Sequence, residues 1–195
     1  MAPLGLRERK KARTQRDIMR AALNAFISRG YENTTLDEIA EAAEVHKRTL
    51  LRYFPTKSHL VLRGQYEALS SFGEDMSARG ATPVMDVWER HVRFYTDLNL
   101  RARFHKELAN IIENDPSVSA EVLRINREYL EILASAFEQE LEAVRSPKVV
   151  SKVVAAALVF GNGAVYRSLI KDDLFDTQSD KMLEVVELIR GLLPA

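Results

Sequence analysis

Recurring helix-start signals constrain the fold of this chain more than any other feature. A capping residue stands directly before a proline at Thr82-Pro83, Asp115-Pro116 and Ser146-Pro147. Proline is favoured at the first position of a helix, where the missing amide proton has no helical partner anyway. Apolar residues between these starts recur every three or four positions, as on one face of a helix, and strand signals are nearly absent. The sequence therefore predicts an all-α fold of about nine helices.

Helix starts and stops divide the chain into a small N-terminal part and a larger remainder. The expected helices cover roughly residues 13–29, 35–43, 46–53, 57–79, 83–99, 101–114, 116–144, 147–171 and 179–193. We expect an N-terminal helix-turn-helix domain over residues 1–56 and a C-terminal helical ligand-binding and dimerisation domain over residues 57–195.

The net charge of zero hides a division of charge between these parts. Residues 1–63 hold 13 Lys and Arg against 7 Asp and Glu, a balance of +6, and the remainder carries the opposite balance. A basic N-terminal part favours a polyanionic partner. A solvated basic terminus explains the charge about equally well.

Composition excludes several classes of function. An apolar fraction of 46% is enough to bury a core, so disorder is not expected. The chain has no cysteine, which fits a reducing cytoplasm. No signal peptide is recognisable, and the longest apolar run, Val153 to Phe160, is too short to span a bilayer, so we expect a cytoplasmic protein without a membrane partner.

Sequence signatures of enzymes and cofactor sites are missing. There is no nucleophile elbow, phosphate-binding loop or dinucleotide fingerprint. The four histidines His46, His59, His91 and His105 show no compact ligand spacing. We therefore expect no catalytic residues, no metal and no cofactor.

Residues 35–54 have the pattern of a helix-turn-helix. Thr35 and Glu38 form a capping box that opens the first short helix. Apolar residues are spaced to fill the core of a three-helix unit, and Ala40 is small where the two short helices cross. The second short helix leaves donors and cations on its outer side, as a major-groove helix requires. These residues are Lys47, Arg48, Thr49, Arg52 and Tyr53.

This segment resembles the TetR family of regulators. The resemblance covers roughly residues 13–65 and rests on many positions at fixed spacing, namely Thr34, Thr35, Ile39, Ala40, Ala43, Val45, Thr49, Leu50, Tyr53, Phe54, Pro55, Lys57 and Leu60. Beyond it, the chain matches the family in length and helix count only.

The resemblance implies roles for individual residues. Thr35 is expected to cap a helix and touch a phosphate, and Tyr53 and Lys57 match phosphate-holding positions. Lys47, Arg48 and Thr49 match positions that meet bases or backbone. Three departures are Glu44, where a turn glycine is common and strain is expected, His46, where serine is common, and Leu51, where tyrosine is common.

The basic residues Arg7 to Arg13 precede the first expected helix. They suit either an arm that follows DNA or a frayed terminus, and the sequence does not distinguish the two.

The apolar residues of two C-terminal helices predict a homodimer. A protein that binds palindromic double-stranded DNA needs two such subunits. The segment from Val149 to Ile170 is apolar on nearly every face, although a buried helix in a monomer has the same pattern. The expected interface residues are Val153, Ala157, Phe160, Gly161, Ala164, Val186 and Ile189.

Aromatic and polar residues in the C-terminal part predict a pocket for a hydrophobic or aromatic effector. Its expected lining is Met76, Trp88, His91, Tyr95, Phe104, Tyr129, Phe137, Asn162 and Tyr166. An ordinary core has much the same composition, but buried His91 and Asn162 each need a partner.

The sequence thus favours a DNA-binding transcriptional regulator, with repression relieved by a small lipophilic effector as the family default. The alternative is an architectural or division-control DNA-binding protein without an inducer. A cavity with convergent polar groups favours the first.

Overall fold

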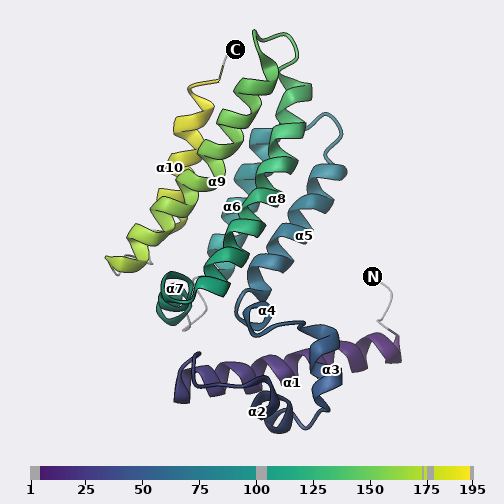
Figure 1. Cartoon of the computed structure of the whole chain (residues 1–195). Helices are drawn as coiled ribbons and strands as arrows, with labels where there is room; N and C mark the ends of the chain where they lie inside the picture. Colours follow the sequence, from purple (N-terminus) through teal and green to yellow (C-terminus); the bar gives the residue numbers. More distant parts are fainter. Residues whose placement is uncertain (1–4, 100–104, 173, 175–177, 194–195) are drawn as a thin grey trace. The chain divides into compact units, whose positions relative to one another are not determined.

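The computed structural model describes residues 5–99, 105–172, 174 and 178–193 (Figure 1). The chain forms two compact units, Met1–Arg63 and Gly64–Ala195. Regular secondary structure in the described residues is entirely helical, which confirms the all-α prediction.

The N-terminal unit contains α1 (Leu6–Arg29), α2 (Leu36–Ala42), α3 (Lys47–Tyr53) and α4 (Lys57–Val61). Most of the apolar residues predicted to fill its core are buried, among them Ile18, Ile39 and Leu50, whereas Ala43 and Val45 are half-buried. Helix α1 begins earlier than expected, because the Gly5 amide donates to the Glu8 carboxylate at 3.2 Å and forms a start that lacks a typical capping side chain.

The helix expected over residues 57–79 is divided in two at Leu62, which brings the number of described helices to ten. Leu62 is fully buried, and its backbone angles of −95° and 13° depart from helical values. Leu60 and Val61 are also buried. The division between the units therefore lies after Arg63, so α4 belongs with the helix-turn-helix instead of the C-terminal domain.

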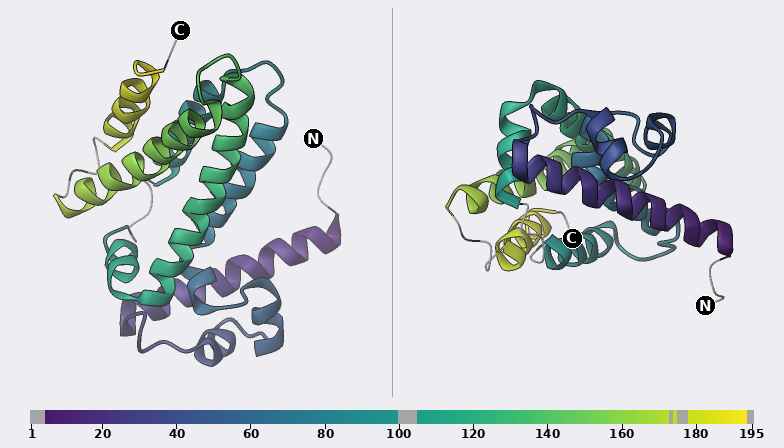
Figure 2. Two further views of the ribbon diagram at one scale, coloured as in Figure 1. Left: turned by 45° about the horizontal axis from the view of Figure 1, so that its top comes forward. Right: turned by 90° about the horizontal axis from the view of Figure 1, so that it is seen from below.

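The C-terminal unit contains α5 (Arg63–Ser77) apart from its first residue, α6 (Val84–Asn99), α7 (His105–Asn114), α8 (Pro116–Glu140), α9 (Pro147–Lys171) and α10 (Gln178–Arg190). Helices α8 and α9 run side by side, and α10 packs against α9 and α6 (Figures 1 and 2). Fully buried Phe72, Leu133 and Leu158 lie in the core of this unit.

The three predicted proline starts are found at or next to the helix ends, but each is completed differently. Asp115 accepts the amides of Ser117 and Val118 at 2.8 and 2.9 Å, as a capping residue does. At α6, the Val84 amide donates to the Glu140 carboxylate at 3.0 Å, so a residue of another helix supplies the cap. Ser146 adopts a φ of +62°, outside the extended region typical of a capping residue.

Helix α9 is more apolar than its longest uninterrupted apolar run indicates. By length and composition, Pro147–Leu169 could cross a membrane, with a mean hydropathy of 1.6. The uninterrupted run ends at Phe160 because Gly161 and Asn162 follow it, whereas the mean hydropathy is taken across such interruptions. A packed helix of a folded unit passes the same test, and α9 contacts α8 and α10.

Candidate functional site

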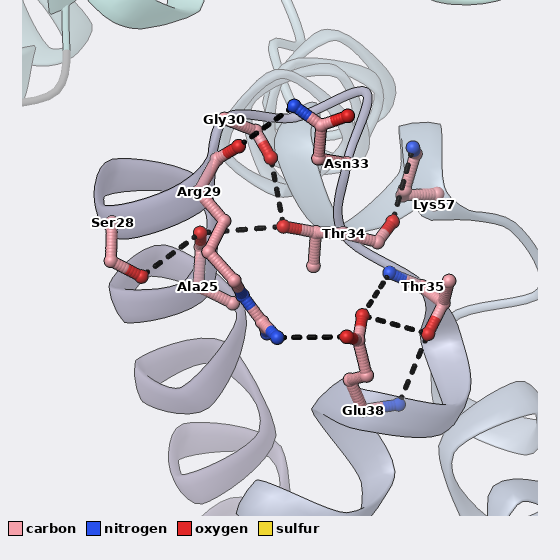
Figure 3. A network of polar contacts seen from close by, with 9 residues as sticks. All are labelled: Ala25, Ser28, Arg29, Gly30, Asn33, Thr34, Thr35, Glu38 and Lys57. Atoms are coloured by element: carbon pink, nitrogen blue, oxygen red, sulfur yellow. Dashed lines mark hydrogen bonds and ion pairs between the residues drawn. The ribbon is translucent and has the colours of Figure 1, made fainter.

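The connection between α1 and α2 is held by the predicted capping box (Figure 3). The Thr35 amide donates to the Glu38 carboxylate at 2.8 Å, and the Glu38 amide donates to Thr35 Oγ1 at 3.3 Å. The Thr35 hydrogen bonds lower the pKa of Glu38, and Arg29 pairs with the same carboxylate at 2.8 Å. These bonds fix the start of α2, so Thr35 has the capping role that the resemblance implies.

Lys57 holds the loop that leads into α2 (Figure 3). Its ammonium donates to the carbonyl oxygens of Tyr31 and Thr34 at 2.8 and 3.2 Å and lies 4.1 Å from the centre of the Tyr31 ring. Since these contacts engage its donors within the unit, Lys57 serves here to position the loop. The phosphate contact implied by the resemblance requires some of them to be released.

The turn between α2 and α3 contains Glu44 in the left-handed region, with a φ of +54°. This confirms the strain expected there, because residues with a Cβ rarely adopt this conformation. The Val45 amide donates to the Ala40 carbonyl at 2.9 Å and closes the turn. Ala40 is only 3% exposed, so the crossing has no room for a larger side chain.

Helix α3 presents the cations predicted to face DNA. Lys47, Arg48 and Arg52 are exposed, and Thr49 and Tyr53 are half-buried. The Arg52 guanidinium lies 5.0 Å from the centre of the Tyr53 ring, which orients it along the helix. Lys47 pairs with Asp37 at 2.7 Å, so it must exchange one ionic partner for another if it binds a phosphate.

A groove of about 970 Å³ runs beside α3 and the first turns of α1. Its lining comprises Arg7, Lys10, Lys11, Thr14, Glu41, Glu44, Val45, His46, Thr49, Arg52 and Tyr53. The basic segment before residue 13 is helical from Leu6 onward, not frayed, and Figure 2 shows it as a continuation of α1. The structure thus gathers basic residues from both helices on one surface of the N-terminal unit.

The C-terminal unit contains a pocket of about 220 Å³ among α5, α6, α8, α9 and α10. Six of the predicted effector-binding residues line it, namely Trp88, His91, Tyr95, Tyr129, Asn162 and Tyr166. Met76 and Phe137 are buried but do not line it, and Phe104 lies outside the described residues. Its described lining includes no Asp, Glu, Lys or Arg.

Three titratable groups in the pocket are kept neutral by burial. Desolvation lowers the pKa of His91 to about 4, so its imidazole is uncharged at neutral pH. The His91 Nε2 lies 3.1 Å from the Tyr129 hydroxyl, and desolvation raises the pKa of Tyr129. Burial also raises the pKa of Tyr166 to about 12. His91 therefore has the partner that a buried polar group needs.

Three other buried side chains that line the pocket have polar atoms without a hydrogen-bond partner among the residues that the structure describes. They are the indole nitrogen of Trp88 and both amide atoms of Asn162 and Gln178. The side chain of Asn162 is 4% exposed and that of Gln178 is 1% exposed. Sequence reasoning singled out Asn162 but missed Gln178, because the first residue of an amphipathic helix normally faces solvent.

The predicted dimer residues separate into two groups. Val153 and Phe160 are 62% and 44% exposed, and Ala157 and Ala164 are exposed on the same stripe of α9. Gly161 instead faces α10 of its own chain, where an added Cβ would lie 3.2 Å from Val185 Cγ1. Val186 and Ile189 are likewise buried within the chain. Periodicity could not separate these groups, because both lie on strongly apolar helices.

The fold and surface of the N-terminal unit define the helix-turn-helix class of DNA-binding domains. Residues 18–63 match the model of the family described as bacterial regulatory proteins, tetR family. The N-terminal unit therefore contains a DNA-binding domain of the TetR family.

Two regulators are similar in sequence to this chain, each over a different share of its length. The regulator TcmR of Streptomyces glaucescens is 33% identical over 132 residues, which are 64% of this chain and 58% of TcmR. The uncharacterized regulator YvkB of Bacillus subtilis is 26% identical, with 88% of this chain and 92% of YvkB covered. This chain thus spans less than two thirds of TcmR.

Solved structures resemble the fold over nearly the whole chain. Thermus thermophilus FadR, a TetR-family transcriptional repressor in complex with lauroyl-CoA, has a TM-score of 0.59 at 20% identity, covering 93% of this chain and 96% of FadR. At this identity the similarity shows the shared fold.

Proposed function

We propose that this chain is a transcriptional regulator that binds a palindromic DNA operator and is released by a small molecule. The observation that carries the proposal is the shared surface of α1 and α3. It joins Arg7, Lys10 and Arg52 in one groove next to exposed Arg48. Cations on a short helix of this class suit the major groove, and basic residues beside it suit the phosphate backbone.

The proposed active form is a homodimer. Exposed apolar residues on one stripe of α9 include Val149, Val153 and Phe160. Helix α10 adds exposed Leu188, and exposed Leu192 follows the end of this helix. Large apolar side chains in such a patch favour a protein partner. A second copy of the chain meets the need of a palindromic operator for two α3 helices.

The pocket among α5, α6, α8, α9 and α10 is the proposed effector site. Thermus thermophilus FadR, a repressor of this family, has been solved in complex with lauroyl-CoA. The pocket of the present chain contains buried polar atoms that have no hydrogen-bond partner among the described residues. An effector that binds better to one arrangement of α5 shifts the population toward that arrangement and changes operator affinity by the same coupling energy. Repression relieved by the effector is the proposed direction.

The alternative is an architectural DNA-binding protein without an effector. A core filled around Trp88 and His91 was the feature expected of that class. The pocket found at these two residues favours the regulator.

Selection of DNA from a random duplex library by the purified protein tests this function. A regulator is expected to enrich an inverted repeat whose half-sites are centred about 10 base pairs, or a multiple of that spacing, apart. Enrichment of A·T-rich DNA without a defined repeat favours the architectural role. Recovery of no DNA above background contradicts both.

A further inference from the structure

The polar atoms, charge and size of the C-terminal pocket restrict the kind of ligand that can bind there. The inference below rests on the proposed ligand-responsive function and concerns the chemistry of that ligand. Within the described part of the chain, three polar side chains around one space have no hydrogen-bond partner, namely Trp88 on α6, Asn162 on α9 and Gln178 at the start of α10.

The unpartnered atoms are mixed in their hydrogen-bonding character. The Trp88 indole can only donate, whereas each carboxamide of Asn162 and Gln178 offers two N–H donors and one accepting oxygen. Buried polar groups of this kind normally have a partner, and in an empty pocket water can serve. A ligand that displaces this water must provide both acceptors and donors to avoid leaving them unsatisfied.

The electrostatic character of the pocket excludes a charged ligand group inside it. Its described lining contains no acidic or basic side chain other than His91. Burial lowers the pKa of His91 to about 4, so this group is neutral at physiological pH. A carboxylate or ammonium in the pocket lacks an ionic partner, which makes its transfer from water unfavourable.

The walls favour a flat ring. The centroids of Trp88 and His91 lie 5.4 Å apart, and those of His91 and Tyr95 lie 4.7 Å apart, within the aromatic cluster that lines the pocket. A volume of about 220 Å³ is below the roughly 300–1,000 Å³ typical of pockets for drug-sized ligands. A compact ligand of one or two fused rings matches this size better than a long acyl chain with a phosphorylated carrier.

We infer that the effector is a compact, uncharged, planar molecule with a carbonyl acceptor and an adjacent N–H or O–H donor, bound by Trp88, Asn162 and Gln178. Amides, lactams and hydroxy-carbonyl compounds share this donor–acceptor edge. The carboxamides pair with that edge, and the indole N–H donates to a carbonyl oxygen. Anionic effectors are disfavoured at this site.

Calorimetric titration of the full chain with four naphthalene probes tests the inference. The probes are 2-naphthamide, 2-acetylnaphthalene, 2-naphthoate and 2-methylnaphthalene, which share a ring but differ in donor, acceptor and charge. We expect 2-naphthamide to bind at least about tenfold more tightly than 2-naphthoate, and 2-acetylnaphthalene to fall between them. Equal or tighter binding of the anion overturns the inference, as does the absence of 2-naphthamide binding at about 1 mM.

Two isosteric variants assign the recognition to the side chains. Asn162→Leu and Gln178→Met remove buried amides that have no protein partner, so their melting temperatures are expected to stay the same or rise. Their affinity for 2-naphthamide should fall by about tenfold or more, while that for 2-methylnaphthalene persists. Unchanged affinity for 2-naphthamide in both variants contradicts the inference. If a variant does not fold, the probe series on the wild-type protein still decides.

These measurements are independent of DNA. Failure of the probe series with intact operator binding overturns the ligand chemistry and leaves the regulator function standing. If the probes are bound with the expected selectivity but no operator is bound, the ligand chemistry stands and the proposed regulator function is wrong.

Discussion

Glu44 shows how a single residue can store strain at a functional turn. Its φ of +54° places a residue with a Cβ in the left-handed region between α2 and α3. This conformation costs roughly 1–2 kcal/mol for a residue other than glycine. The turn keeps it because the backbone on both sides is fixed, with the Val45 amide bonded to the Ala40 carbonyl.

Replacement of Glu44 by glycine is expected to stabilise the N-terminal unit. Glycine relieves the strain but has a larger entropy loss on folding, so a net gain of about 0.5–1 kcal/mol remains. Chemical denaturation measures the difference. Glu44→Ala is the matched control, since it removes the same charge but keeps the Cβ, and it should give no comparable gain. Equal stabilisation by both substitutions would point to charge as the cause.

His91 gives the C-terminal unit a predictable dependence on pH. Its pKa of about 4 lies below the ordinary value of about 6.5 expected for the unfolded chain. Between these values the unfolded state binds more protons than the folded state, so stability falls as the pH decreases from about 6.5 toward 4. The slope from this residue approaches about 1.4 kcal/mol per pH unit and vanishes below pH 4.

Denaturation of the wild type and of His91→Phe between pH 4 and 7 measures this contribution. The aromatic variant has no imidazole to protonate, so its stability should depend less on pH across about 4 to 6.5. Its stability at pH 7 is expected to be lower because the contact with the Tyr129 hydroxyl is lost. Parallel pH profiles for the two proteins contradict the assignment to His91.

Gly161 permits a close approach between helices α9 and α10. A Cβ at Gly161 would lie 3.2 Å from Val185 Cγ1, closer than most real Cβ contacts. Arg190 fastens the same α10 to α6 through Asp86 at 2.8 Å and Glu89 at 2.9 Å. Helix α10 therefore has little freedom to move away from α9.

Gly161→Leu is expected to destabilise the C-terminal unit by about 1–3 kcal/mol, as overpacking of a close contact typically does. Gly64→Leu is the matched control, because an added Cβ at Gly64 meets no atom within 4 Å. The control should be neutral or slightly stabilising, since leucine favours a helix more than glycine does. Thermal unfolding compares the two, and a similar loss in both would argue against the close contact.

Local signals in the sequence were sufficient to predict most elements. Capping at Thr35 and Asp115 depends on neighbours a few residues away, so the positions of α2 and α8 could be predicted. The break at Leu62 could not, because it depends on burial of that side chain in the tertiary structure. The same reason hid the cap that Glu140 provides for α6.

The candidate sites were predictable to the extent that they follow local pattern. The exposed cations of α3 follow from the helix-turn-helix spacing. Gln178 in the pocket and Gly161 against α10 depend on how distant helices meet, and no pattern within one helix reveals this. The hydrogen bonds of the Lys57 ammonium to loop carbonyls far away in sequence were not predictable either, and the phosphate contact that the resemblance implies stays a prediction.

At the scale of the whole molecule, binding of a palindromic operator requires two copies of the chain. Removal of the apolar stripe on α9 is expected to give folded monomers with weaker operator binding. Val153→Arg with Phe160→Arg places charges at two exposed positions, so the fold should tolerate both while the dimer does not. Sedimentation at micromolar concentration measures the change.

Leu123→Arg is the control for this dimer prediction. Leu123 is 58% exposed on α8, outside the proposed interface, and the same kind of substitution there should leave a dimer. A wild-type monomer, or dissociation by the control as well, contradicts the assignment of the interface to α9.

The affinity of the purified protein for its selected DNA site, measured as the salt concentration increases, tests whether the chain binds DNA in a sequence-specific way. Phosphate contacts release counterions, so affinity should fall steeply with salt, and the specific site should be bound about 10³-fold or more tightly than random DNA. Arg48→Ala should weaken specific binding by about 1–3 kcal/mol and random binding much less. Equal affinity for the selected site and random DNA contradicts sequence-specific DNA binding. An affinity that changes neither with salt nor with Arg48→Ala contradicts it as well.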